Sequence, residues 1–275
     1  MRMLPPSHPG RIIDRLEVGE AELVRELLDN GGVSIALQPV VTINAPRVVG
    51  WEALVRAHHP QMGPIPPLVL VDVAKQNGML DELTRQVADL AIDALDRACE
   101  LVDDQLLVVT VNVELEQFYA SNPFIEWLLQ RELPSKGQFV LEITERDGDT
   151  WTPAHERAAR LLVARGIDLA LDDVGAGHSR IGFFRHREWQ LVKIDQSFLT
   201  WETERDRKVI ELFVHMIHGL GLASLAEGIE TVEHLLFAQS LGIRYGQGYW
   251  LGHPEPVEDV LAELRERGTA IETSF

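Results

Sequence analysis

The sequence predicts an α/β protein of the (β/α)8, or TIM-type, barrel class, modified by an antiparallel first strand. Short apolar runs alternate with amphipathic helical segments over most of the 275 residues, a length that suits one such barrel. Most of the runs are continuously apolar, which is typical of strands that are covered on both faces. The first two runs are the exception to the alternation, because only a short turn separates them.

These two runs predict a β-hairpin. Residues 33–41 and 47–56 read as strands, and Asn44-Ala45-Pro46 forms the turn between them. A parallel pair needs a much longer crossover connection, so the pair is expected to be antiparallel. A helix over 21–30 precedes the hairpin and ends at Gly31-Gly32, a typical helix stop.

The rest of the chain alternates between strand and helix. We expect six further strands at 106–112, 139–144, 167–173, 190–195, 223–229 and 244–250. Helices are expected at about 81–101, 123–131, 155–166, 204–221, 231–242 and 257–268, and a short segment at about 178–187. No linker or second composition regime interrupts the pattern, so residues 21–275 are predicted to form one domain after a lead-in over residues 1–20.

Composition excludes several classes of function. The net charge of −18 disfavours binding to DNA, RNA or an anionic membrane through a basic patch. The single cysteine, Cys99, rules out a disulfide framework or a cysteine zinc site and is expected in the core. We find no signal-peptide pattern and no apolar run near the ~20 residues of a membrane span. The prediction is a cytoplasmic protein.

Six predicted strands end on an acid or an amide. In barrels of this class the carboxyl ends of the strands meet at one rim, where the active site lies. One such acid alone is readily explained as a helix cap or a solvated side chain, but six strands sharing the feature indicate a common site. The residues are Glu52, Asn112, Glu142, the pair Asp172 and Asp173, Asp195 and Glu227.

This set of oxygen ligands favours Mg²⁺ or Mn²⁺ over zinc. The adjacent Asp172 and Asp173 can serve two ions, and paired ions are the usual device for attack on a phosphodiester. Lys193 lies on a neighbouring strand and can enter the same rim. It can act as a structural counter-ion, or it can hold the attacking water, which is the role we favour.

Several motifs carry a resemblance to a known family. Glu52-Ala53-Leu54 is followed in order by VNVELEQF, LEITE, DDVGAGHS, VKID, AEGIE and GQGYWLGHP. Over about residues 21–265 the chain resembles the EAL-domain phosphodiesterases. The resemblance implies hydrolysis of cyclic di-GMP to linear pGpG with two Mg²⁺ or Mn²⁺ ions per site, on a modified barrel whose first strand is antiparallel.

The resemblance also implies a role for each matching position. Glu52, Asn112, Glu142 and Asp172 would bind one ion, and Asp172 would bridge to a second ion held by Asp173 and Glu227. Glu227 is either that ligand or the general base, and Lys193 and Gln247 would contact the attacking water. The other assignments are substrate binding by Gln38, Leu54, Arg56 and Asp195, and support of the ligands by Glu145 and Glu230. A salt bridge from Arg56 to a rim acid is the alternative to its phosphate contact.

The chain departs from the family pattern in the loop DDVGAGHSR, at Val174, Ala176, His178 and Arg180. In the family this loop joins the dimer interface to the metal site, so we expect the changes to affect regulation and dimerisation more than chemistry. The expected assembly is a homodimer through the loop and helix after the fifth strand, with a possible separate sensory partner. The alternatives to an active enzyme are a silent cyclic di-GMP receptor and an enzyme for another phosphodiester.

Overall fold

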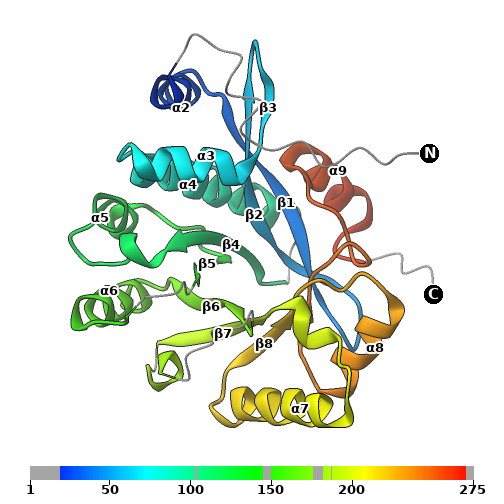
Figure 1. The fold of residues 1–275 in the computed structure, drawn as a ribbon. Helices are drawn as coiled ribbons and strands as arrows, with labels where there is room; N and C mark the ends of the chain where they lie inside the picture. The colour runs from blue at the N-terminus through cyan, green and yellow to red at the C-terminus, as the bar shows by residue number, and fades with distance from the viewer. Residues whose placement is uncertain (1–18, 103–104, 145–149, 176–181, 187, 271–275) are drawn as a thin grey trace, which may run out of the picture.

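The computed structural model describes residues 19–270, except 103–104, 145–149, 176–181 and 187. Eight strands close into a barrel with helices around it (Figure 1). In order along the chain they are β1 (Val33–Thr42), β2 (Val48–His59), β4 (Leu107–Glu114), β5 (Gly137–Thr144), β6 (Asp168–Val174), β7 (Trp189–Ile194), β8 (Ala223–Ala226) and β9 (Tyr245–Gly246). The predicted barrel class is therefore confirmed.

Strand β1 is the antiparallel strand of the barrel. It pairs antiparallel with β2 on one side and with β9 on the other, while β2 and β4 to β9 pair parallel with each other. The register places Gln38 of β1 directly opposite Glu52 of β2. Two short strands extend the sheet outside the barrel, β3 (Gly63–Ile65) against β2 and β10 (Glu255–Pro256) against β1.

The helices surround the strands and agree with most of the predicted ranges. They are α2 (Glu20–Asp29), α3 (Pro67–Gln76), α4 (Leu80–Cys99), α5 (Pro123–Gln130), α6 (Pro153–Ala164), α7 (Glu204–Gly219), α8 (Val232–Ser240) and α9 (Val257–Arg267). Helix α3 was not predicted. Helix α7 begins at a capping box in which Thr203 and Asp206 each accept from the other's backbone N–H. None of the described helices is long and apolar enough to cross a bilayer.

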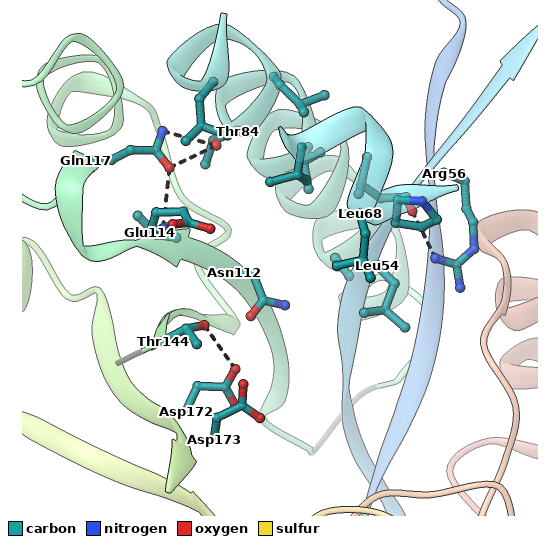
Figure 2. Close-up of a pocket in the computed structure, with 18 residues that line it drawn as sticks. Leu54, Arg56, Leu68, Thr84, Asn112, Glu114, Gln117, Thr144, Asp172 and Asp173 are labelled. Atoms are coloured by element: carbon teal, nitrogen blue, oxygen red, sulfur yellow. Dashed lines mark hydrogen bonds between the residues drawn. The ribbon is translucent and has the colours of Figure 1, made fainter. Parts of the chain in front are cut away.

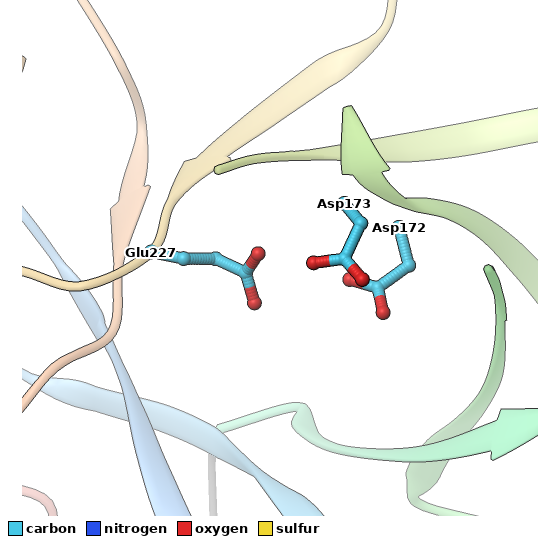
Figure 3. A group of neighbouring side chains, drawn as sticks. All are labelled: Asp172, Asp173 and Glu227. Atoms are coloured by element: carbon cyan, nitrogen blue, oxygen red, sulfur yellow. The ribbon is translucent and has the colours of Figure 1, made fainter. Parts of the chain in front are cut away.

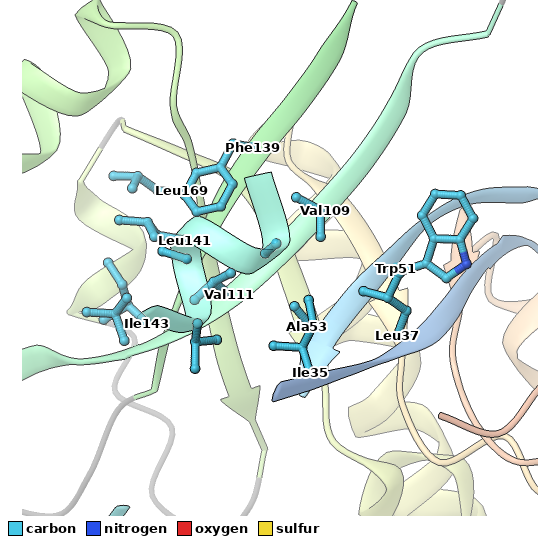
Figure 4. Close-up of a cluster of buried hydrophobic side chains, with 14 of the residues drawn as sticks. Ile35, Leu37, Trp51, Ala53, Val109, Val111, Phe139, Leu141, Ile143 and Leu169 are labelled. Carbon is cyan, nitrogen blue, oxygen red and sulfur yellow. The ribbon is translucent and has the colours of Figure 1, made fainter. Parts of the chain in front are cut away.

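Alternation along the strands separates the hydrophobic layer from the barrel interior. Val109, Val111, Leu141 and Ile143 are almost fully buried and pack in the cluster shown in Figure 4. Successive strand side chains point to opposite faces, so Asn112 and Glu142, which the register aligns, project to the other side. Cys99 is buried at the end of α4, as predicted.

The segment predicted at about 178–187, between β6 and β7, lies partly outside the described residues. Its described part contains only the 3₁₀ turn Phe183–Arg185. Trp151, which precedes α6, packs its ring near the rings of Phe183, His186 and Trp189, and Glu156 accepts hydrogen bonds from Trp151 and His186. These rings and the first turn of α6 bury the start of β7.

The last two barrel strands are shorter than predicted. The ranges 223–229 and 244–250 form strands only over Ala223–Ala226 and Tyr245–Gly246. Gly228 and Gly248 have φ values of 64° and 152°, which are open to glycine at little cost. The chain therefore turns out of the sheet early, and Glu227 and Gln247 lie just beyond the strand ends.

Gly50 tests the close pairing of β2 with β4. A Cβ atom at Gly50 would lie 2.0 Å from the backbone oxygen of Val108, so Gly50→Ala must push the strands apart. We expect a loss of about 3 kcal/mol in the free energy of unfolding, the upper range for overpacking, measured by urea denaturation. Gly219→Ala is the control, because nothing lies within 4 Å of the added methyl at the end of α7. Equal stabilities would contradict the tight β2–β4 pairing.

Candidate metal centre

The strand-end acids of the sequence converge on one ammonium group. The Nζ atom of Lys193, in β7, lies 3.3 Å from Glu52 Oε2 and 2.8 Å from Glu142 Oε2. It also lies 3.0 Å from Asp172 Oδ1 and 2.8 Å from Glu227 Oε1. Five different strands or strand ends thus supply one cluster, with the lysine only 1% exposed.

Neutral side chains complete the cluster. Asn112 Nδ2 donates to Glu52 Oε1 at 2.6 Å, and Gln247 Nε2 donates to Glu52 Oε2 at 2.7 Å. Thr144 Oγ1 donates to Asp172 Oδ2 at 3.3 Å. Thr144 was not among the predicted site residues, although it lies two positions after Glu142 and so shares its strand face.

Asp172, Asp173 and Glu227 form a second group on the same rim. One oxygen atom from each lies within 4.8 Å of the oxygens of the others. Figure 3 shows the three carboxylates directed toward a common space. Asp173 has φ 53°, a left-handed conformation in which non-glycine residues are uncommon and which recurs at functional sites.

Burial perturbs these acids strongly. Burial raises the pKa of Glu142 well above its ordinary value, and Glu52 and Asp172 add to the rise while Lys193 opposes it. Burial likewise raises the pKa of Glu227 to about 8. Burial lowers the pKa of Lys193, but the surrounding carboxylates outweigh this and raise it well above its ordinary value. Burial also favours the neutral form of Glu52. The charge of Lys193 and the hydrogen bonds that Glu52 accepts outweigh burial and lower the pKa of Glu52.

The donor set fits divalent cations. Among the described residues, Glu142 Oε1 and Gln247 Oε1 are buried without a hydrogen-bond partner, and buried polar atoms normally have one. Carboxylate and amide oxygens are the ligands that Mg²⁺ and Mn²⁺ prefer. One ammonium cannot balance the clustered carboxylates, so a bound cation would relieve both the repulsion and the unpaired atoms.

The predicted substrate-binding residues lie around this centre. Gln38 Nε2 donates to the backbone oxygen of Gly252 at 3.4 Å, and Gln38 and Glu230 line a hollow beside Glu52 and Glu227. Leu54 and Arg56 line a cavity that reaches Asp172 and Asp173. Asp195 accepts from Ser197 N at 3.0 Å and caps the turn after β7. Burial raises the pKa of Asp173, and the charges of Asp172 and of Asp195 add to the rise, so Asp195 also lies near the centre.

The predicted salt bridge of Arg56 and the predicted supporting role of Glu145 have different outcomes. In the described part of the chain, Arg56 forms no ion pair with a rim acid, and its Nη1 atom donates to the Val55 oxygen. Glu145, predicted as a supporting residue, lies outside the described residues. So do Ala176, His178 and Arg180 of the variant loop.

Comparison with known proteins identifies the family. The family model for the EAL domain matches residues 21–254, so the chain belongs to the EAL-domain family. PdeN, a probable cyclic di-GMP phosphodiesterase of Escherichia coli, is 32% identical over 242 residues, 84% of this chain and 45% of PdeN. The E. coli cyclic di-GMP phosphodiesterase PdeL is 30% identical over 246 residues, 88% of this chain and 68% of PdeL. The chain thus spans less than half of PdeN.

Solved structures show the same fold. The PaMucR phosphodiesterase in complex with c-di-GMP matches with a TM-score of 0.77 at 27% identity, covering 88% of this chain and all of that chain. An EAL domain protein from Listeria monocytogenes matches with a TM-score of 0.77 at 22% identity, covering 90% of this chain and 98% of that chain. The modified barrel is therefore the fold of the family.

Removing Lys193 should destabilise the protein in the absence of divalent ions. Breaking a buried charge cluster by removing one partner costs about 3–5 kcal/mol, so Lys193→Met should lower the free energy of unfolding by about that amount in EDTA. Lys208→Met is the control, because Lys208 pairs with Glu211 on the surface. Urea denaturation checks the prediction, and equal effects of both variants would contradict it.

Glu227 should give a defined pH dependence in the same metal-free protein. Its pKa is raised to about 8 in the folded state, so folding favours the protonated carboxyl. That stability is present at low pH and is lost as pH rises through about 8, by at most about 1.4 kcal/mol per pH unit for one proton. Glu227→Gln removes this titrating group. The melting temperature of the variant minus that of the wild type should therefore become more positive between pH 5 and pH 9. A difference that does not change with pH would contradict the raised pKa.

Proposed function

We propose that this chain hydrolyses cyclic di-GMP to linear pGpG, using two divalent ions, Mg²⁺ or Mn²⁺. The observation that carries the proposal is the convergence of the complete oxygen donor set around Lys193. Relatives named as cyclic di-GMP phosphodiesterases support the choice of substrate. A homodimer, a cytoplasmic location and a separate sensory partner belong to the same proposal.

Each residue of the cluster has a role in this reaction. Glu52, Asn112, Glu142 and Asp172 would hold one ion, and Asp172, Asp173 and Glu227 the other. Bound there, the ions would supply activation of water and stabilisation of the charge that develops on the phosphate. Glu145 is assigned to the support of these ligands from its sequence position, and Glu230 from its place beside Glu227.

Proton movement depends on the chain's own groups. Lys193 can release its contact with Glu142 and Glu227 and donate to the attacking water, while Gln247 orients that water from the other side. With the ions bound beside it, Glu227 would be the carboxylate placed to accept the proton of that water. Arg56 can fork onto a phosphate oxygen after giving up its bond to the Val55 oxygen.

Glu52→Ala tests the proposed function. Mutation of a residue that only supports a metal ligand commonly lowers activity by about 10–100-fold. Loss of the ligand itself should therefore lower kcat by more than about 100-fold. Chromatography measures the conversion of cyclic di-GMP to pGpG in the presence of Mn²⁺. Glu263→Ala on the exposed face of α9 is the control and should retain full activity.

Wild-type protein that binds cyclic di-GMP but forms no pGpG would overturn the proposal. That result would favour the receptor alternative instead. Conversion of a different cyclic dinucleotide with no conversion of cyclic di-GMP would also overturn the choice of substrate.

A further inference from the structure

Strand β6 carries a β-bulge where it reaches the metal centre. Its register against β7 shifts between Leu171 and Val174, and over this stretch β6 has one residue more than β7, which defines a bulge. Successive strand side chains normally point to opposite faces, but Asp172 and Asp173 both line the cavity that adjoins the centre (Figure 2). The bulge therefore turns two neighbouring carboxylates to the same side, and Asp173 adopts its φ of 53° within it.

The bulge leaves Asp172 aligned with a neighbouring strand on one side only. Between β6 and β7, both of which the structure describes in full, Asp172 has no aligned partner. On the other side it is aligned with Thr144, the last residue of β5. Regular pairing with β7 therefore does not fix the direction of the Asp172 side chain, and the contact with β5 becomes the more important one.

Two different side chains hold the two oxygen atoms of the Asp172 carboxylate. Oδ1 lies 3.0 Å from the Nζ atom of Lys193, which three further carboxylates share. Oδ2 accepts from Thr144 Oγ1 at 3.3 Å, the bond drawn between them in Figure 2. Because threonine is branched at Cβ, few χ1 rotamers are open to it, and the strand backbone sets the direction of its hydroxyl group. A carboxylate oxygen has two lone pairs, so accepting this bond does not prevent Oδ2 from binding an ion.

We propose that Thr144 is the positioning residue for Asp172, and that its hydroxyl group fixes the orientation of the carboxylate that the two ions would share. Thr144 acts through Asp172 and is not itself a ligand. Residues that orient a metal ligand by a hydrogen bond commonly contribute about 10- to 100-fold to metal affinity or activity. A carboxylate on a bulge depends on such a bond more than one in a regularly paired strand. This inference rests on the proposed function, because it assumes that divalent ions bind at Asp172.

Three variants isolate the hydroxyl group of Thr144. Thr144→Val replaces the hydroxyl group by a methyl group and removes the donor to Asp172. Thr144→Ser keeps the donor and removes only the methyl group. Thr269→Val is the matched control, because Thr269 Oγ1 donates to Gln105 Oε1 at 2.7 Å in a partly buried contact. Gln105 precedes β4, so this contact lies at the end of the strand opposite to the metal centre.

The first measurement is the binding of Mn²⁺ to the substrate-free protein by isothermal titration calorimetry. We expect Thr144→Val to raise the dissociation constant for Mn²⁺ by about 10- to 100-fold. Thr144→Ser and Thr269→Val should keep a dissociation constant close to that of the wild type. A purely structural role of Thr144 would instead lower the free energy of unfolding and leave the affinity of the folded protein for Mn²⁺ unchanged.

The second measurement is the turnover of cyclic di-GMP as a function of Mn²⁺ concentration. Thr144→Val should need about 10- to 100-fold more Mn²⁺ for half-maximal activity. Its KM for cyclic di-GMP at saturating Mn²⁺ should equal that of the wild type, because Thr144 acts on a metal ligand and not on the substrate. Recovery of activity at high Mn²⁺ thus separates lost affinity for the ions from a lost substrate contact.

An unchanged Mn²⁺ dissociation constant in Thr144→Val would overturn the inference. Equal weakening in Thr144→Ser would also overturn it, because that variant keeps the hydroxyl group, and so would equal weakening in Thr269→Val. Each of these results can occur while the wild type binds Mn²⁺ and converts cyclic di-GMP, so the inference can fail without the proposed function. Wild-type protein that binds no Mn²⁺ would overturn the proposed function and the inference together.

Discussion

The structure depends on the burial of several carboxylates around one ammonium group. Two like charges about 4 Å apart repel by about 4 kcal/mol at the effective dielectric near a protein surface, and Lys193 faces Glu52, Glu142, Asp172 and Glu227 at 2.8–3.3 Å. One positive charge cannot offset this set. The barrel therefore holds an excess of negative charge in place, and this excess is what makes the rim a site for divalent cations.

The antiparallel first strand and the early ends of β8 and β9 shape this rim. Antiparallel pairing puts Gln38 opposite Glu52, so an uncharged side chain lies next to a proposed ligand. A Cβ atom at Gly248 would lie 2.3 Å from the backbone nitrogen and oxygen of Ile229, so only glycine permits this close approach. The approach places Gln247 within 2.7 Å of Glu52. Local backbone freedom and the charge cluster are thus parts of one arrangement.

Sequence patterns could predict the hairpin, the strands and the meeting of strand-end acids at one rim, because these depend on local periodicity and on where strands end. They could not predict helix α3 or the lengths of β8 and β9, since those follow from packing against distant segments. Thr144 shows the same limit. Its position two residues after Glu142 was visible in the sequence, but its acceptor Asp172 lies 28 positions away, and only the folded chain brings the two together. Glu145 and most of the DDVGAGHSR loop lie outside the described residues, so those predictions stay predictions.

The number of ions bound per chain tests the central claim most directly. Equilibrium dialysis of the purified protein against Mn²⁺, with free ion measured by electron paramagnetic resonance, gives this number without any substrate. The charge cluster predicts two ions per chain in the wild type and a weakened second ion in Asp173→Asn. Absence of specific Mn²⁺ binding, with no stabilisation of the fold by the ion, would contradict the account.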